Sequence, residues 1–132
     1  MIDILEINGR EIRKLEIIKY TPKFELLDGE GTERTKAPGW DLIRNPQGVI
    51  CNFNIEIFET RTDNPDFIYF MEQFVSLGSV PFLPIKHRDP MGKVWNQLMY
   101  YVVDEFDIEV FEDGYAYTSD IKAQFIAKKG KV

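Results

Sequence analysis

Three acidic residues at alternate positions are the first candidates for chemistry in this chain. Glu105, Asp107 and Glu109 lie on a stretch whose pattern is typical of a β-strand, so they share one face. Successive side chains on that face are roughly 6.5 to 7 Å apart, which overlaps the carboxyl separation of inverting glycosidases. The opposite face carries apolar residues: Phe106, Ile108 and Val110. This alternation favours a simpler interpretation, in which the acids are the solvated side of an ordinary strand.

The sole histidine and the sole cysteine are the next candidates. His87 and Asp89 face the same side of an extended chain and could begin a metal site, but a catalytic zinc needs three protein ligands. Cys51 alternates with Phe53 and Ile55, which predicts a buried thiol and not a nucleophile paired with His87. We therefore expect no metal, no cofactor and no catalytic residue. A lone cysteine also excludes an intramolecular disulfide.

A polar, glycine-punctuated segment, residues 28–48, interrupts the strand-like pattern. Its glycines invite a phosphate-loop interpretation, but no lysine follows them in the required register. Ordering such a segment costs on the order of 20 kcal/mol of backbone entropy, whereas Trp40, Leu42 and Ile43 each return at most about 2 to 3 kcal/mol on burial. Connections this long are uncommon in compact domains unless they bind something. We expect a partner-docking arm, the alternative being a floppy surface excursion.

Composition limits the remaining possibilities. The chain has 132 residues, which fits a single domain spanning 1–132. Its 22 acidic and 16 basic residues give a net charge of -6, which argues against specific nucleic-acid binding. No apolar run approaches the length of a membrane helix. The first residues include acids and show no basic segment before an apolar one, so we expect no secretory signal.

The elements that would position these residues are mostly strands. Asn8-Gly9 predicts a tight hairpin turn between strands near 4–7 and 12–18. Pro22 predicts that any strand through 24–27 is bent or lies at a sheet edge. Clean alternation over 49–57 predicts a half-buried strand. Asn64 followed by Pro65 predicts the start of a helix that ends near residue 77, with one apolar stripe facing the core.

The second half of the chain predicts a long hairpin around Asp113-Gly114, after a short apolar piece at 82–85. Its first strand, 98–110, would place one set of side chains on a common face: Leu98, Tyr100, Val102, Phe106, Ile108 and Val110. The predicted fold class is mainly β, a two-sheet β-sandwich or split barrel of about seven to eight antiparallel strands. One flanking helix (about 65–77) and the long loop (28–48) complete it.

The order of these features resembles small structural proteins of long-tailed bacteriophages and prophages. The motifs that carry the resemblance are Ile7-Asn8-Gly9-Arg10-Glu11-Ile12, Asp28-Gly29-Glu30-Gly31-Thr32-Glu33-Arg34, Arg44-Asn45-Pro46-Gln47-Gly48, the single helix and Met99-Tyr100-Tyr101-Val102. The similar proteins are tail-tube, distal-tail and baseplate-hub components. The resemblance implies a β-sandwich or split barrel flanked by one helix, with a long loop reaching the neighbouring subunit of a ring, commonly a hexamer.

Carried onto this sequence, the resemblance implies a non-enzymatic virion structural protein that forms homo-oligomeric rings and contacts other tail proteins. Residues 28–48 would be the inter-subunit arm, with Arg34, Trp40, Leu42 and Ile43 at the interface. The candidates for a lumen lining that repels DNA are Asp104, Glu105, Asp107 and Glu109. The expected location is the virion tail, and the host bacterial cytoplasm before assembly. These 132 residues show no sign of the second galectin-like domain that many distal-tail proteins carry, so the resemblance favours a plain tube or a small hub and adaptor protein.

A different class of function is a β-sandwich module that binds a ligand such as a carbohydrate. Exposed tyrosines would act as stacking platforms, and the candidates are Tyr100, Tyr101, Tyr115 and Tyr117. Because Tyr100 and Tyr101 lie on opposite faces of their strand, only one of the two can belong to the core. A small hydrolase built on Glu105, Asp107 and Glu109 is the third and weakest possibility.

Overall fold

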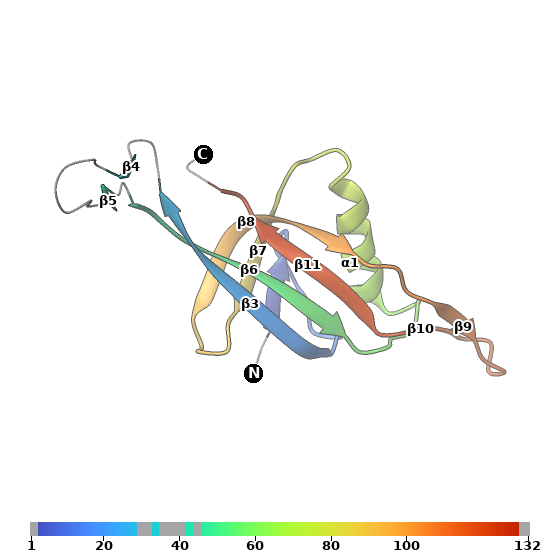
Figure 1. Ribbon diagram of the computed structural model, residues 1–132. Helices are drawn as coiled ribbons and strands as arrows, with labels where there is room; N and C mark the ends of the chain where they lie inside the picture. The colour runs from blue at the N-terminus through green and yellow to red at the C-terminus, as the bar shows by residue number, and fades with distance from the viewer. Residues whose placement is uncertain (1–2, 29–32, 35–41, 44–45, 130–132) are drawn as a thin grey trace.

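The computed structural model describes residues 3–28, 33–34, 42–43 and 46–129. Its elements, in chain order, are β1 (Asp3–Ile7), β2 (Arg10–Glu11), β3 (Ile17–Asp28), β4 (Glu33–Arg34), β5 (Leu42–Ile43), β6 (Pro46–Ile57), α1 (Pro65–Ser76), β7 (Leu83–Arg88), β8 (Val94–Val103), β9 (Ile108–Val110), β10 (Ala116–Thr118) and β11 (Ile121–Ala127). Figure 1 shows α1 on one side of a large sheet, with β4 and β5 at one end of the molecule and β9 and β10 at the other.

The main sheet has seven antiparallel strands in the order β2-β1-β7-β8-β11-β6-β3. Two further sheets, β4 with β5 and β9 with β10, have two strands each among the described residues. The end strands β2 and β3 do not pair with each other in the described part of the chain, so the sheet is not closed into a barrel. The predicted mainly β fold with one flanking helix is confirmed.

Local sequence signals account for several of these elements. Asn8 and Gly9 both have positive φ, at 49° and 85°, as a type I′ hairpin turn requires. Pro22 lies in β3, the strand at the sheet edge, where a missing N–H is tolerated. The predicted second strand of the first hairpin is shorter than expected, because β2 ends at Glu11 and the chain leaves the sheet before β3.

The core lies between α1 and one face of the sheet. Tyr101 in β8 stacks on Phe70 of the helix, with ring centroids 4.8 Å apart, and on Phe125 of β11 at 4.7 Å. Phe125 in turn stacks on Phe53 of β6 at 4.6 Å. These aromatic rings join the helix to three strands, and the stripe predicted for the helix faces them as expected.

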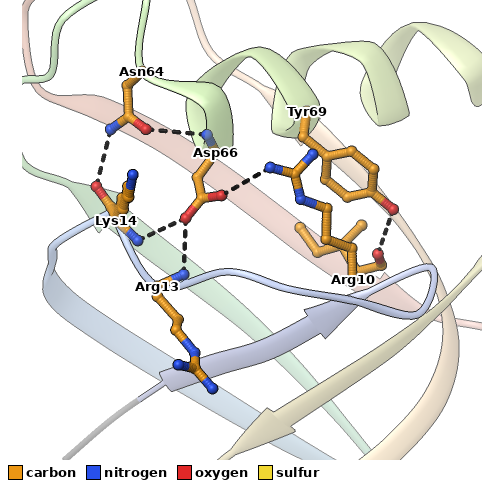
Figure 2. Close-up of polar contacts among 7 residues, drawn as sticks. Arg10, Arg13, Lys14, Asn64, Asp66 and Tyr69 are labelled. Atoms are coloured by element: carbon orange, nitrogen blue, oxygen red, sulfur yellow. Dashed lines mark hydrogen bonds and ion pairs between the residues drawn. The ribbon is translucent and has the colours of Figure 1, made fainter.

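A polar hub fixes the start of α1 (Figure 2). Asn64 caps the helix by accepting a hydrogen bond from the amide of Asp66 at 3.0 Å. The Asp66 carboxylate accepts bonds from the backbone amides of Arg13 (2.9 Å) and Lys14 (2.7 Å) and pairs with Arg10 at 3.3 Å. The hub therefore ties the connection between β2 and β3 to the first turn of the helix.

Burial alone would raise the pKa of Asp66. The hydrogen bonds from the amides of Lys14 and Arg13, together with the charge of Arg10, outweigh that effect and leave the pKa below its ordinary value. The Asp66 carboxylate is thus held in its charged form and acts as a structural acceptor. Separately, the Tyr69 hydroxyl links the helix to β1 by donating to the Ile7 carbonyl at 2.7 Å.

Candidate functional site

An apolar surface that no part of the described chain covers is the candidate functional site. Strand β11 pairs with β6 only as far as Phe53, so beyond that point β6 has β3 as its strand partner. We call residues 24–28 with 46–51 the β3–β6 arm. Register pairs Phe24 with Cys51 and Leu26 with Val49, which places all four on the same face as the core.

The helix lies over the middle of the sheet and leaves this end open (Figure 1). Phe24, Leu26 and Val49 are exposed, and Leu26 retains 62% of its accessible surface. We call these three residues the arm face. The core surface thus continues past the helix as an apolar strip in water, and exposed apolar patches of this kind mark interaction sites.

Trp95 closes the inner end of the arm face. Its ring lies 5.9 Å from Phe24 and stacks on His87 at 6.4 Å, centroid to centroid. The indole N–H donates to Asp89 at 2.9 Å, and the Lys93 ammonium lies 4.1 Å from the centre of the ring. This arrangement fixes a large aromatic side chain beside the exposed strip and places a positive charge next to it.

Asp89 is buried and holds the turn after β7. Its carboxylate accepts bonds from the amides of Met91 (2.9 Å) and Lys93 (3.0 Å) as well as from Trp95. The Trp95 hydrogen bond is the largest influence on its pKa, which lies below the ordinary value. Its oxygens are therefore occupied by turn hydrogen bonds, and the described residues include no group of three or more potential metal ligands.

His87 and Cys51 lie together beneath the arm face, but their surroundings make them inert. Tyr20 separates them, with its hydroxyl 3.3 Å from His87 Nδ1 and 3.8 Å from Cys51 Sγ. Desolvation raises the pKa of Cys51 and lowers that of His87, so neither the thiolate nor the imidazolium is favoured. The expectation of a buried cysteine is confirmed, and His87 is the penultimate residue of β7.

Gln97 completes this buried cluster, because its side-chain amide pairs with the backbone N–H and C=O of Cys51 as a neighbouring strand would. Oriented so that its nitrogen faces His87, the amide donates to His87 Nε2 (2.9 Å) and to the Cys51 carbonyl (3.0 Å) and accepts from the Cys51 amide (3.1 Å). A side chain thus satisfies the β6 backbone at the point where β11 has ended. The cluster is a satisfied structural network that supports the arm from below.

The residues predicted for the inter-subunit arm are described only in part. Residues 28 and 46–48 belong to β3 and β6, so the connection is shorter than the expected 28–48 loop. Within it, β4 pairs with β5, and the backbone of Arg34 lies opposite that of Leu42 and Glu33 opposite Ile43. Trp40 lies outside the described residues. The structure therefore brings Arg34, Leu42 and Ile43 together in one small hairpin.

The predicted acidic strand is wrong in one respect. Strand β8 ends at Val103 and β9 begins at Ile108, so Asp104, Glu105 and Asp107 lie in the connection and only Glu109 lies in a strand. The long hairpin is broken because β9 pairs with β10 as a separate ribbon that leaves the main sheet. All four acids are exposed. The evenly spaced row of carboxylates that the sequence suggested does not form.

The sequence left open whether the Tyr100 face or the Tyr101 face of this strand belongs to the core, and the structure shows that it is the Tyr101 face. Leu98 and Val102 are exposed, while Met99 and Tyr101 are buried. The physical reason is the register with β11, which places Tyr101 opposite the buried Phe125 and Met99 opposite Ala127. Ile108 and Val110, predicted to be core, are exposed as well. Sequence alternation identified the two faces but could not show which one the helix covers.

The tyrosines proposed as stacking platforms are mostly engaged. Tyr101 is only 1% exposed and cannot bind a ligand. Tyr115 lies under the Arg61 guanidinium at 3.5 Å, Tyr117 packs edge-on against Phe111 with ring centres 5.0 Å apart, and Tyr100 is half-buried. Of the four, Tyr115 keeps the most exposed surface, at 44%, and Arg61 lies over its ring. None of the arm-face residues was singled out from the sequence, although the alternation of Phe24 and Leu26 along an edge strand was a usable signal.

Comparisons with known proteins give one weak likeness. The sequence matches no protein-family model and no curated protein. A solved structure, the tail of an empty GTA particle with C6 symmetry, is similar over 93% of this chain and 85% of that chain, with a TM-score of 0.41 and 11% identity. At that level the likeness carries no argument about function. No helix among the described residues is long and apolar enough to cross a membrane.

Proposed function

We propose that this chain is a non-enzymatic structural subunit of a phage-like tail, a tube, distal-tail or hub component that assembles with other copies into rings. The tail assignment rests on the sequence motifs described above. The single observation that supports assembly is the arm face, because it extends the core surface of the sheet beyond the helix and exposes Phe24, Leu26 and Val49 to water. The expected location is the virion tail.

Burial of this surface would add to the free energy of association. Full burial of a Val, Leu or Phe side chain stabilises by about 1.5 to 3 kcal/mol, so covering what the three side chains still expose gives about 2 to 5 kcal/mol in all. Every 1.4 kcal/mol corresponds to about tenfold in affinity. The arm face alone would thus strengthen association by roughly 30-fold to several thousand-fold, with the 28–48 segment adding contacts of its own.

Assembly is tested by mass measurement over a range of concentrations. Size-exclusion chromatography with light scattering on the full chain should show species heavier than 15.5 kDa. Leu26→Glu places a charge in the arm face and should weaken these species by at least about tenfold, since it removes apolar contact and buries an unpaired carboxylate. The matched control is Val75→Glu, at a helix position that is 73% exposed, which should assemble like the wild type.

The proposal fails if the wild-type chain remains monomeric up to high concentration. Equal weakening by Leu26→Glu and Val75→Glu would also count against it, because the effect would then reflect added charge and not a defined interface. The residues Arg34, Trp40, Leu42 and Ile43 belong to the same proposed interface, and Trp40→Ala should weaken assembly through loss of an aromatic anchor.

A further inference from the structure

The β9–β10 ribbon presents a second uncovered apolar surface, at the opposite end of the molecule from the arm face (Figure 1). Register places Ile108 opposite Thr118 and Val110 opposite Ala116, so these four residues share one face of the ribbon. On that face Thr118 is buried and Ala116 is half-buried, so Ile108 and Val110 form its exposed part. Ile108 is 56% exposed and Val110 is 73% exposed. An isolated two-stranded ribbon is marginally stable in water, and a partner surface would supply the packing it lacks.

The ribbon is nevertheless held firmly at its base. The Thr118 amide donates a hydrogen bond to the Thr60 carbonyl at 2.8 Å, and the Thr62 amide donates to the Ala116 carbonyl at 3.0 Å. The Arg61 guanidinium, between them, covers the Tyr115 ring. The Thr118 hydroxyl, on the same face as Ile108, also accepts from the Thr60 amide at 3.2 Å. Ile108 and Val110 themselves remain exposed.

Charge distinguishes the two ends. Between Asp104 and Ile121 every charged residue is acidic: Asp104, Glu105, Asp107, Glu109, Glu112, Asp113 and Asp120. At the other end Lys93 is exposed beside Trp95, at the inner end of the arm face. An acidic ribbon with exposed apolar side chains and an apolar face with Lys93 at one end are complementary, and such complementarity selects orientation and partner.

We infer that the β9–β10 ribbon of one copy docks on the arm face of the next copy. The inference rests on the proposed function and names the contact that assembly uses. The occupant is a second copy because the acidic ribbon complements the Lys93 end of the arm face, while the ribbon and the arm of one molecule lie at opposite ends (Figure 1). Two ribbons, each apolar on one face, would pack face to face about 10 Å apart, as stacked sheets do.

The contact is heterologous, since it joins two different surfaces of the same chain. Each copy would offer one ribbon and one arm face, so the contact repeats until a ring closes. This geometry predicts complementation between two assembly-defective variants, which an interface made of one surface paired with itself would not show.

The test uses Val110→Glu in the ribbon and Leu26→Glu in the arm face, each checked by circular dichroism for native secondary structure. Both positions are exposed in the single chain, so the fold should persist. Each variant alone should be monomeric at concentrations where the wild type assembles. Mixed in equal amounts, they should form a species of two chains that grows no further, because each variant keeps the surface that the other lacks.

A second experiment tests the role of the Lys93 charge. Lys93→Glu should weaken assembly by at least fivefold, whereas Lys93→Arg, which keeps the positive charge, should assemble like the wild type. The difference in assembly between the two variants should shrink as the salt concentration is raised. If the wild type assembles while Val110→Glu assembles equally well, the ribbon contact is overturned and the proposed function stands. Monomeric variants that fail to associate on mixing also overturn it. A wild-type chain that never assembles overturns the proposed function as well.

Discussion

Replacing Asp66 by asparagine tests whether one buried carboxylate fixes the helix to the sheet. The carboxylate accepts two backbone amides, from Arg13 at 2.9 Å and Lys14 at 2.7 Å. Hydrogen bonds to a charged acceptor contribute about 1.5 to 3 kcal/mol each and those to a neutral one about 0.5 to 1.5. Losing a negative charge at the helix N-terminus costs about 0.3 to 1 kcal/mol more. We expect Asp66→Asn to lower the free energy of unfolding by about 2 to 4 kcal/mol.

The measurement is urea unfolding followed by circular dichroism, at neutral and at acidic pH. Because the folded pKa of Asp66 lies below its ordinary value, its stabilisation is complete above the unfolded pKa of about 3.9 and is lost as the pH falls through the folded pKa. The difference between wild type and variant should therefore be full at pH 7 and should shrink below about pH 4.

Asp63→Asn is the matched control, since Asp63 is three residues earlier and pairs with Arg61 while its side chain is 60% exposed. An exposed ion pair is screened by water and contributes little to stability, so this variant should stay close to the wild type. The reasoning is refuted if the two variants lose equal stability, or if the Asp66→Asn deficit is the same at pH 7 and pH 3.

Three further predictions concern the core. Tyr101→Ala should cost about 3 to 5 kcal/mol of unfolding free energy because a fully buried ring is removed, whereas Tyr100→Ala should cost less; equal losses in thermal melts would contradict the assigned face. The thiol of Cys51 should react with a thiol reagent only on unfolding, since it is buried with a raised pKa; rapid labelling of the native chain would refute this. Burial lowers the pKa of His87, so stability should fall as the pH drops below about 6.5, and His87→Gln should flatten the profile in that window.

Local patterns were sufficient for much of the fold. Asn8-Gly9 predicted its turn because few residues adopt two consecutive positive φ values, and Asn64-Pro65 predicted the helix start because both signals act within one turn. The alternation from Cys51 to Ile57 identified a buried strand face. The burial of Cys51 also followed from that alternation.

Other features depended on contacts distant in sequence. Both faces of β8 carry apolar residues at every second position, so alternation could not show which face belongs to the core. Pairing with β11 and contact with α1 place Met99 and Tyr101 in the core, and not Leu98 and Tyr100. The same ambiguity hid the exposure of Ile108 and Val110, because the break between β8 and β9 arises from pairing with β10. Tyr20, His87 and Gln97 meet only through strand pairing.

The sequence by itself determined the turns, the helix and the mainly β class, since these depend on residues a few positions apart. Only the tertiary structure decided where the core ends. The helix covers one part of the sheet, and the strands that extend beyond it carry Phe24, Leu26 and Val49 into solvent. Whether an apolar residue is core or interface is set by what packs above it, and that information is distributed over the whole chain.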